Sequence, residues 1–146
     1  ANMATSLIPH VSKVRVSSVL NRDVKQFGKQ FLFDGQDETC WNSDQGCPQF
    51  IHLEFNSPVK VSEVRIQFQG GFVGKECWVE CKNCQAGEDA SLTKICSVYP
   101  DDINSLQCFP VEPSPPTTAL RIVFNTSTDF FGRIIVYNLD ILASTT

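Results

Sequence analysis

Cysteine is the residue type with the most chemical options in this chain, because seven cysteines within 146 residues could form disulfides, bind a metal or remain thiols. Cys77, Cys81 and Cys84 follow a C-x3-C-x2-C spacing, which could hold zinc together with a further cysteine or a histidine. Structural zinc sites usually present two well-spaced pairs, and only Cys81 and Cys84 have that spacing here. The odd number leaves at least one cysteine unpaired, and the start of the chain lacks the pattern of an export signal. We therefore expect reduced thiols, with zinc and disulfides as the alternatives.

Groups that could perform catalysis are few. The two histidines are His10, near the start of the chain, and His52, in the middle of an expected strand. The sequence contains no G-x-S-x-G elbow, no P-loop and no H-E-x-x-H motif. We interpret Asp101 and Asp102, which follow a proline, as a solvated turn rather than an acid and a base held in a pocket. The sequence therefore predicts a protein that is not an enzyme.

Length and charge restrict the classes of protein further. We expect a single domain over residues 1–146, with residues 1–10 loose and with Ala1 and Asn2, which precede Met3, a cloning remnant. The net charge of -4 argues against non-specific nucleic-acid binding as the main activity. No apolar run approaches the roughly 18 residues that span a bilayer.

The elements that must position any site are short strands with period-two patterning. Ile51, Leu53 and Phe55 alternate with polar residues, as expected of a half-buried strand, and the same pattern returns after a short break at Pro58. Two strands so close in sequence are predicted to form an antiparallel pair. One helical turn is expected within residues 21–30, ending near Gly28. The expected strands are 14–19, 49–55, 61–68, 77–81, 92–99, 107–111, 120–124 and 134–142, which favours an all-β antiparallel sandwich of about eight strands.

The stretch 31–55 organises this pattern. Asp34 and Gly35 have turn chemistry, because glycine tolerates positive φ and the aspartate can bond the backbone two residues on. Trp41 stands among polar neighbours, and we expect it to close one end of the core, because so large an apolar ring gains most from burial.

A family pattern is carried by the residues of the same stretch. Phe33-Asp34-Gly35, Asp37, Thr39, Trp41, Ser43-Asp44 and Gln49 to Leu53 resemble the discoidin or coagulation-factor type C pattern. The resemblance implies the galactose-binding-like jelly roll. The Trp-x-Ser-Asp run also resembles the Doc domain of the anaphase-promoting complex. Within the superfamily the chain is similar, over nearly its whole length, to small nuclear-receptor-associated proteins; residues 17–21, 26–29, 40–46, 66–72 and 128–133 carry that likeness.

The resemblance implies a function that composition alone does not. It implies a nuclear protein, with the cytoplasm as a second location, that binds an orphan nuclear receptor. It would act as a transcriptional repressor by reducing engagement of DNA response elements by the receptor. The charge and the lack of a long apolar run indicate no direct contact with nucleic acid or membrane, and we do not expect a small-molecule or sugar ligand. The alternatives are a carbohydrate-binding lectin-like domain, for which Trp78 would have to be exposed, and a Doc-like substrate receptor of a ubiquitin ligase.

Jelly rolls of this kind bind partners with loops at one end, and three loops are therefore predicted to form the site. Phe72, Phe130 and Phe131 could supply apolar anchors, and Arg133 a forked donor. The alternative is that the two adjacent phenylalanines divide between core and loop, with Arg133 paired to Asp129. The predicted partner-binding residues are Asn42, Ser43, Asp44, Gln45, Gly70, Gly71, Phe72, Asp129, Phe130, Phe131, Gly132 and Arg133.

The resemblance also implies a metal ligand set. Asp34, Asp37, Thr39 and Asn138 match positions that bind calcium in many family members, and hard oxygen ligands suit that ion. The alternative is a turn capped by Asp34 and tied by hydrogen bonds.

Overall fold

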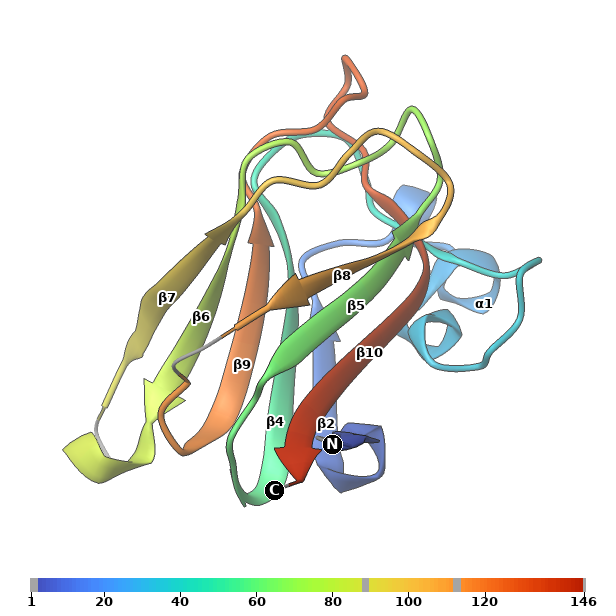
Figure 1. The fold of residues 1–146 in the computed structure, drawn as a ribbon. Coiled ribbons are helices and arrows are strands. Elements are labelled where there is room, and N and C mark those ends of the chain that lie inside the picture. The colour runs from blue at the N-terminus through green and yellow to red at the C-terminus, as the bar shows by residue number, and fades with distance from the viewer. Residues whose placement is uncertain (1–2, 88–89, 112–113, 146) are drawn as a thin grey trace.

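Two antiparallel sheets face each other in the computed structural model, which describes residues 3–87, 90–111 and 114–145. Figure 1 shows the two layers, with the short helical turns of residues 20–32 at one side of them. The arrangement is the predicted all-β jelly-roll sandwich, and that prediction is confirmed.

The first layer, which we call the β10 sheet, has five strands. Its order is β1-β10-β5-β8, and β3 pairs with β10 outside this order. The strands are β1 (Met3–Ser6), β3 (Trp41–Asn42), β5 (Glu63–Phe68), β8 (Leu106–Pro110) and β10 (Ile135–Thr145).

The second layer, the β4 sheet, also has five strands, in the order β2-β4-β9-β6-β7. Every pairing in both layers is antiparallel. The strands are β2 (Val11–Val16), β4 (Gln49–Val59), β6 (Cys77–Asn83), β7 (Leu92–Val98) and β9 (Thr117–Phe124).

Helical structure is limited to short turns. The predicted helical turn is α1 (Val24–Phe27), which begins after Asp23, whose side chain accepts a bond from the Gln26 amide, and ends at Gly28. The 3-10 turns are η1 (Ile8–His10), η2 (Leu20–Arg22), η3 (Lys29–Leu32) and η4 (Cys84–Ala86). None of the helices in the described residues is long and apolar enough to span a bilayer.

The core lies between the layers and follows the predicted alternation. Ile51 and Leu53 of β4 are fully buried, and Phe68 of β5 faces them from the opposite sheet, also fully buried. Trp41 has no exposed surface, and its ring lies 6.2 Å from that of Phe124. The indole nitrogen of Trp41 donates to the Ser18 carbonyl at 2.9 Å, so the one polar atom of the ring is satisfied. The prediction that Trp41 belongs to the core is confirmed.

The predicted pairing of the strands on either side of Pro58 is wrong. β4 pairs with β2 and β9, whereas β5 pairs with β10 and β8, so the short connection crosses from one layer to the other. Each of the two strands has an apolar face. Because the strands lie in opposite sheets, both of these faces are buried in the core between the layers. Pro58 lies inside β4 where the register with β9 shifts between Glu54 and Val59, a position that tolerates a missing amide donor.

The start of the chain is more ordered than expected. Met3–Ser6 forms β1, whose register with β10 pairs Ser6 with Leu142, and Leu7 is 5% exposed. The backbone of β10 supplies these hydrogen bonds, so a segment without a strong pattern of its own still forms a strand. The interpretation of Ala1 and Asn2 as a cloning remnant lies outside the described residues.

We predict that Trp41→Ala lowers the free energy of unfolding by about 3–5 kcal/mol, because it leaves a large cavity in the core and an unpaired Ser18 carbonyl. Urea denaturation measures the change. Tyr99→Ala is the control, since Tyr99 is 70% exposed and its removal should cost less than about 0.5 kcal/mol. Equal losses for both variants would contradict the assignment of Trp41 to the core.

Candidate functional site

The three predicted loops meet at one end of the sandwich, the upper end in Figure 1. The Gly46 amide donates to the Phe131 carbonyl at 2.7 Å, which joins the first loop to the third. The Thr128 amide donates to the Val73 carbonyl at 2.8 Å, which joins the third loop to the second. We call the surface formed by residues 42–47, 70–74, 101–104 and 127–133 the loop apex.

The sequence did not predict the fourth segment of the loop apex, residues 101–104. The side chains of Asp102 and Asn104 each accept a bond at 2.7 Å, from the amides of Gly71 and Gly70 respectively. Gly71 has φ of 91°, a conformation that favours glycine and that directs its amide to the carboxylate. The sequence did show side chains in this turn that can accept hydrogen bonds. A turn that contacts only solvent has the same composition, so these residues did not predict the contact with Gly70 and Gly71.

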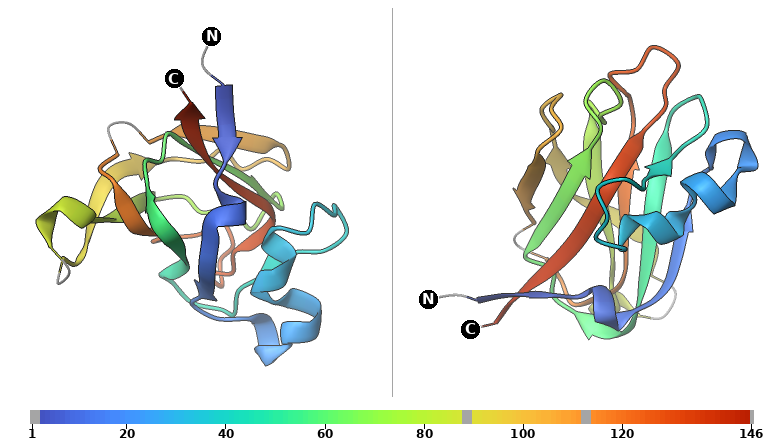
Figure 2. Two further views of the ribbon diagram at one scale, coloured as in Figure 1. Left: turned by 90° about the horizontal axis from the view of Figure 1, so that it is seen from below. Right: turned by 90° about the vertical axis from the view of Figure 1, so that its right-hand side faces the viewer.

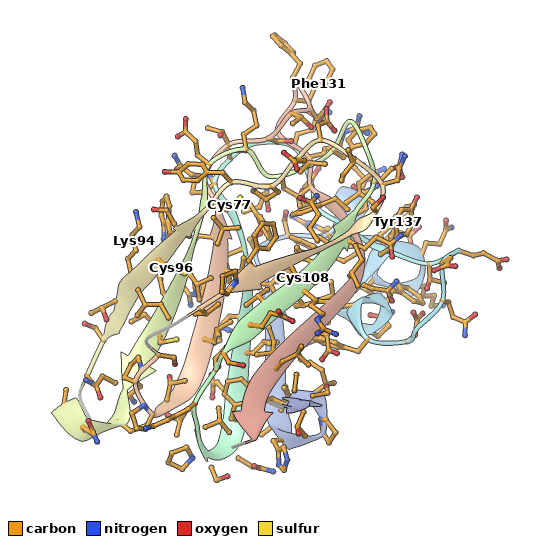
Figure 3. All side chains as sticks on the ribbon, viewed as in Figure 1. Cys77, Lys94, Cys96, Cys108, Phe131 and Tyr137 are labelled. Atoms are coloured by element: carbon orange, nitrogen blue, oxygen red, sulfur yellow. The ribbon has the colours of Figure 1, made fainter. Side chains whose placement is uncertain are left out.

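Phe130 and Phe131 stand at the tip of the loop apex. Phe130 is 94% exposed and Phe131 is 55% exposed, and their rings meet edge to face at 5.3 Å. Figure 3 shows Phe131 at the outer end of its loop, away from both sheets. Neither ring enters the core, so the alternative of one core and one loop phenylalanine is wrong. Two adjacent exposed rings form a small apolar surface that could anchor a partner.

The loop that carries these rings is held by several hydrogen bonds. The amide and the Nε of Arg133 both donate to Asp129 Oδ2 at 3.1 Å, and the guanidinium lies 4.8 Å from the centre of the Phe72 ring. Ser127 Oγ donates to the Arg133 carbonyl at 2.7 Å. The local pairing of Arg133 with Asp129, given above as an alternative, is therefore present, and Arg133 braces the loop.

Gly132 allows the close approach of two loops. Its φ is 85°, and a Cβ atom at this position would lie 2.8 Å from the carbonyl carbon of Gly46. Only glycine fits this arrangement without a shift of the backbone.

Three of the predicted partner-binding residues do not face solvent: Asn42, Ser43 and Gly132. Ser43 is fully buried, and its hydroxyl accepts a bond at 2.8 Å from the amide of Ile134. Asn42 is 7% exposed, and its side-chain oxygen has no hydrogen-bond partner among the described residues. These side chains form the floor of the loop apex, while Asp44 is half-buried and Gln45 is exposed.

The charge of Asp129 is stabilised within the loop. Burial disfavours the carboxylate, but the hydrogen bonds from the Arg133 backbone and side chain, with the charge of the guanidinium, outweigh it and hold the pKa of Asp129 below its usual value. The carboxylate is therefore ionised near neutral pH and binds Arg133 in its charged form.

The residues predicted to bind calcium do not form a cage of oxygen ligands. Both oxygens of Asp34 accept hydrogen bonds, one from the Gln36 amide and the other from the Thr39 hydroxyl. Asn138 lies on β10, and its amide nitrogen donates to Gln67 at 3.1 Å. Asp37 is exposed. No three His, Cys, Asp or Glu side chains within the described ranges gather as a metal site would require. These contacts are those of a hydrogen-bonded turn, and calcium binding stays a prediction from the resemblance.

Four of the seven cysteines lie on strands of the two layers, and the other three lie in the connections between strands. All seven are free thiols, and Figure 3 shows Cys77 and Cys96 on the β4 sheet and Cys108 on the β10 sheet. Burial raises the pKa of Cys77 and of Cys81 to about 12, which disfavours the thiolate that zinc binds. These two are packed in the core as small apolar side chains.

His52 and Trp78 lie on the outer face of the β4 sheet. His52 is 5% exposed, and burial lowers its pKa despite a hydrogen bond with Glu54. Its Nδ1 accepts from Arg121 at 3.3 Å and its Nε2 lies 3.2 Å from Glu54, so both ring nitrogens make hydrogen bonds with neighbouring side chains of the sheet. Trp78 is half-buried, donates to Glu80 at 2.8 Å and carries Lys94 5.5 Å above its ring.

Comparison with solved structures defines the class of protein. The fold is similar to an F5/8 type C domain from Bacteroides fragilis, with a TM-score of 0.78 and 14% identity over 92% of each chain. It is equally similar to a family 32 carbohydrate-binding module from Clostridium perfringens solved with galactose, with a TM-score of 0.77, 14% identity and coverage of 97% of this chain and 100% of that one. The protein therefore has the discoidin-like, galactose-binding-like jelly-roll fold.

Curated sequences define the family. The chain is 61% identical over 140 residues to the nuclear receptor 2C2-associated protein of Danio rerio, a match that covers 96% of each. It is 46% identical over 142 residues to the human protein of the same name, covering 96% of this chain and 97% of that one. No family model matches the chain. The chain belongs to the family of nuclear receptor 2C2-associated proteins, as the resemblance predicted.

The low pKa of Asp129 predicts a pH dependence. Because its folded pKa lies below the unfolded value of about 4, its contribution to stability is present above that pH and is lost as the pH falls through the folded pKa. Asp129→Asn should therefore lower the melting temperature near neutral pH, and the difference from wild type should narrow in acid. Asp37→Asn, at an exposed carboxylate, is the control. A difference that stays constant with pH would contradict a role for the charge.

Calcium titration decides between the two interpretations of Asp34. A hydrogen-bonded turn predicts no calorimetric heat and no change in melting temperature, with Asp34→Ala costing less than about 1 kcal/mol in the presence or absence of calcium. Binding of calcium to the folded protein would instead raise the melting temperature with ion concentration, and Asp34→Ala would abolish that rise.

Proposed function

We propose that this protein is a non-enzymatic binding module that associates with an orphan nuclear receptor through the loop apex. The family name supports the receptor as the partner, since the relatives from fish and human are named for association with nuclear receptor 2C2. One structural observation carries the choice of surface: Phe130 and Phe131 are exposed side by side on a loop whose backbone is braced.

The two rings suit the role of an interface anchor. Transferring them from water to an apolar pocket would be favourable by roughly 25 cal/mol per Å² of apolar surface buried. The Arg133 and Asp129 contacts hold the loop before binding, so little conformational entropy remains to be lost. Aromatic side chains at the centre of an interface commonly contribute most of its affinity.

The proposed outcome of binding is transcriptional repression in the nucleus. A protein that binds the receptor better when the receptor is free than when it is on DNA lowers occupancy of response elements by mass action. The net charge of -4 suits this role, because such a protein would compete for the receptor and not for the phosphate backbone.

The tryptophans do not favour sugar binding as the function. Trp41 is buried, and Lys94 lies over the ring of Trp78, whereas stacking on a pyranose needs an open aromatic face. The similarity to the bacterial module solved with galactose is therefore a similarity of fold and does not support galactose as a ligand of this chain.

We predict that Phe130→Ser combined with Phe131→Ser weakens co-precipitation with nuclear receptor 2C2 by at least about tenfold, because both anchors are lost. The melting temperature should stay near that of wild type, since both side chains are exposed. Arg133→Ala tests the contribution of the contact between Arg133 and Asp129. It should weaken binding less than the double variant does, because it loosens the loop but leaves both rings in place. Purified receptor and a labelled response element in a gel shift then measure whether the wild type, but not the double variant, reduces DNA binding.

Leu106→Ser is the matched control, because Leu106 is 50% exposed and belongs to β8, outside the loop apex. Binding by the double variant equal to that of wild type would contradict the proposed surface. Loss of binding in the control alone would place the receptor contact beside β8 instead.

A further inference from the structure

A second surface, remote in sequence from the loop apex, is set apart by its charge. Five of the twelve basic residues fall between positions 13 and 29, together with one acidic residue, Asp23. The rest of the chain holds seven basic and fifteen acidic residues. The basic residues of this segment are Lys13, Arg15, Arg22, Lys25 and Lys29, and all five are exposed.

These cations are left without carboxylate partners. None of them forms an ion pair with an acidic side chain in the part of the chain that the structure describes. Asp23 accepts the Gln26 amide instead, and Glu54, which lies opposite Lys13 in the strand register, contacts His52. An acidic ligand would therefore meet positive charge that the fold does not already neutralise.

The same segment encloses an apolar crevice. Figure 2 shows residues 20–32 as short helical turns standing beside β2, and a crevice of about 290 Å³ lies between them and that strand. Val16, Val19 and Val24 line it, with Arg15 and Lys29. Val24 remains 57% exposed, although aliphatic side chains gain from burial.

Two contacts give the crevice a defined shape. Lys29 Nζ donates to the Val14 carbonyl at 2.8 Å, which ties η3 to the edge strand β2. Gly28 allows the chain to turn closely, because a Cβ atom there would lie 2.5 Å from the Val24 carbonyl oxygen. The segment is thus held against the sheet with the valines open to solvent.

The backbone before the crevice is strained. Asn21 and Arg22 have φ of 53° and 56°, in the left-handed region that a residue with a Cβ rarely adopts. Asparagine tolerates this region, but arginine does so less readily. Such strain tends to occur where a side chain is held for binding, and here the exposed side chain is the Arg22 cation next to the crevice segment.

We propose that the crevice beside α1 binds an acidic peptide segment that carries one aliphatic anchor. The anchor would occupy the space between Val16, Val19 and Val24, and the flanking carboxylates would meet Arg15, Arg22 and Lys25. Charge complementarity selects the acidic partner, and the apolar lining selects the aliphatic side chain.

The observations favour a peptide over a nucleic acid. Single-stranded nucleic acids bind on aromatic stacking platforms, and no aromatic side chain lines this crevice.

Fluorescence anisotropy with three labelled probes tests the proposal. The probes are a short peptide of Asp and Glu with one central Leu, the same peptide with Ser in place of Leu, and a dT oligonucleotide of equal length. The Leu peptide should bind most tightly, and its affinity should fall as salt is added. An oligonucleotide that binds more tightly than the Leu peptide, or equal binding of the two peptides, would overturn the proposal.

Two variants locate the binding. Arg22→Glu with Lys25→Glu should weaken the Leu peptide by about tenfold, because two attractions become repulsions. Lys60→Glu with Lys75→Glu makes the same change of net charge elsewhere on the surface and should leave most of the affinity. Equal loss in both pairs would show that only the net charge matters and would overturn the assignment.

The apolar anchor has its own test. Val24→Ser should weaken the Leu peptide but leave the Ser peptide unchanged, and unchanged binding of both would contradict the role of the crevice. Melting curves show that each variant is folded. Because Phe130→Ser with Phe131→Ser leaves this surface intact, that variant should bind the Leu peptide as wild type does, which separates this inference from the proposed receptor contact.

Discussion

The structure depends on burying the apolar faces of two sheets against each other, with Trp41 closing the end of the core beneath the loops. The ring of Trp41 packs on Phe124, and Phe124 packs edge-on against Phe68 of the other sheet at 5.8 Å, so aromatic contacts link the two layers. The indole nitrogen is bonded to the Ser18 carbonyl, which anchors the segment before α1 to the same point. This cluster therefore supports both proposed surfaces, the loop apex above it and the crevice segment beside it.

The loop apex combines a rigid backbone with exposed apolar rings. Hydrogen bonds between loops and the Arg133 contact with Asp129 hold the backbone, and Gly132 allows two loops to approach closely. The polar side chains of Ser127, Asp129 and Arg133 make hydrogen bonds within their loop, whereas the rings of Phe130 and Phe131 remain exposed. Exposed apolar surface has a cost in water that a binding partner would remove. A site of this kind fits recognition of a protein better than catalysis, which needs titratable groups in a pocket.

The two proposed surfaces differ in their physical character. The loop apex offers aromatic area and one braced ion pair, while the crevice beside α1 offers aliphatic area surrounded by unpaired cations. Affinity at the first would come mainly from buried area and would change little with salt. At the second, electrostatic attraction would matter more and would weaken with ionic strength. A chain with two such surfaces could bind two partners, or two parts of one partner, at the same time, with the gain in affinity that linked binding provides.

The sequence by itself determined eight of the ten strands found in the described residues, the helical turn ending at Gly28, the burial of Trp41 and, through family motifs, the three predicted loops of the proposed site. These features are local, because side chains that alternate every two residues report burial without reference to a partner strand. Only the tertiary structure decided that β4 and β5 lie in different sheets, because a short connection can close a hairpin or cross between layers with the same composition. It also decided that Ser43 is buried and Phe130 exposed, contrary to their polarity. The exposure of a loop side chain depends on which distant segments pack beside it, and local sequence does not contain that information.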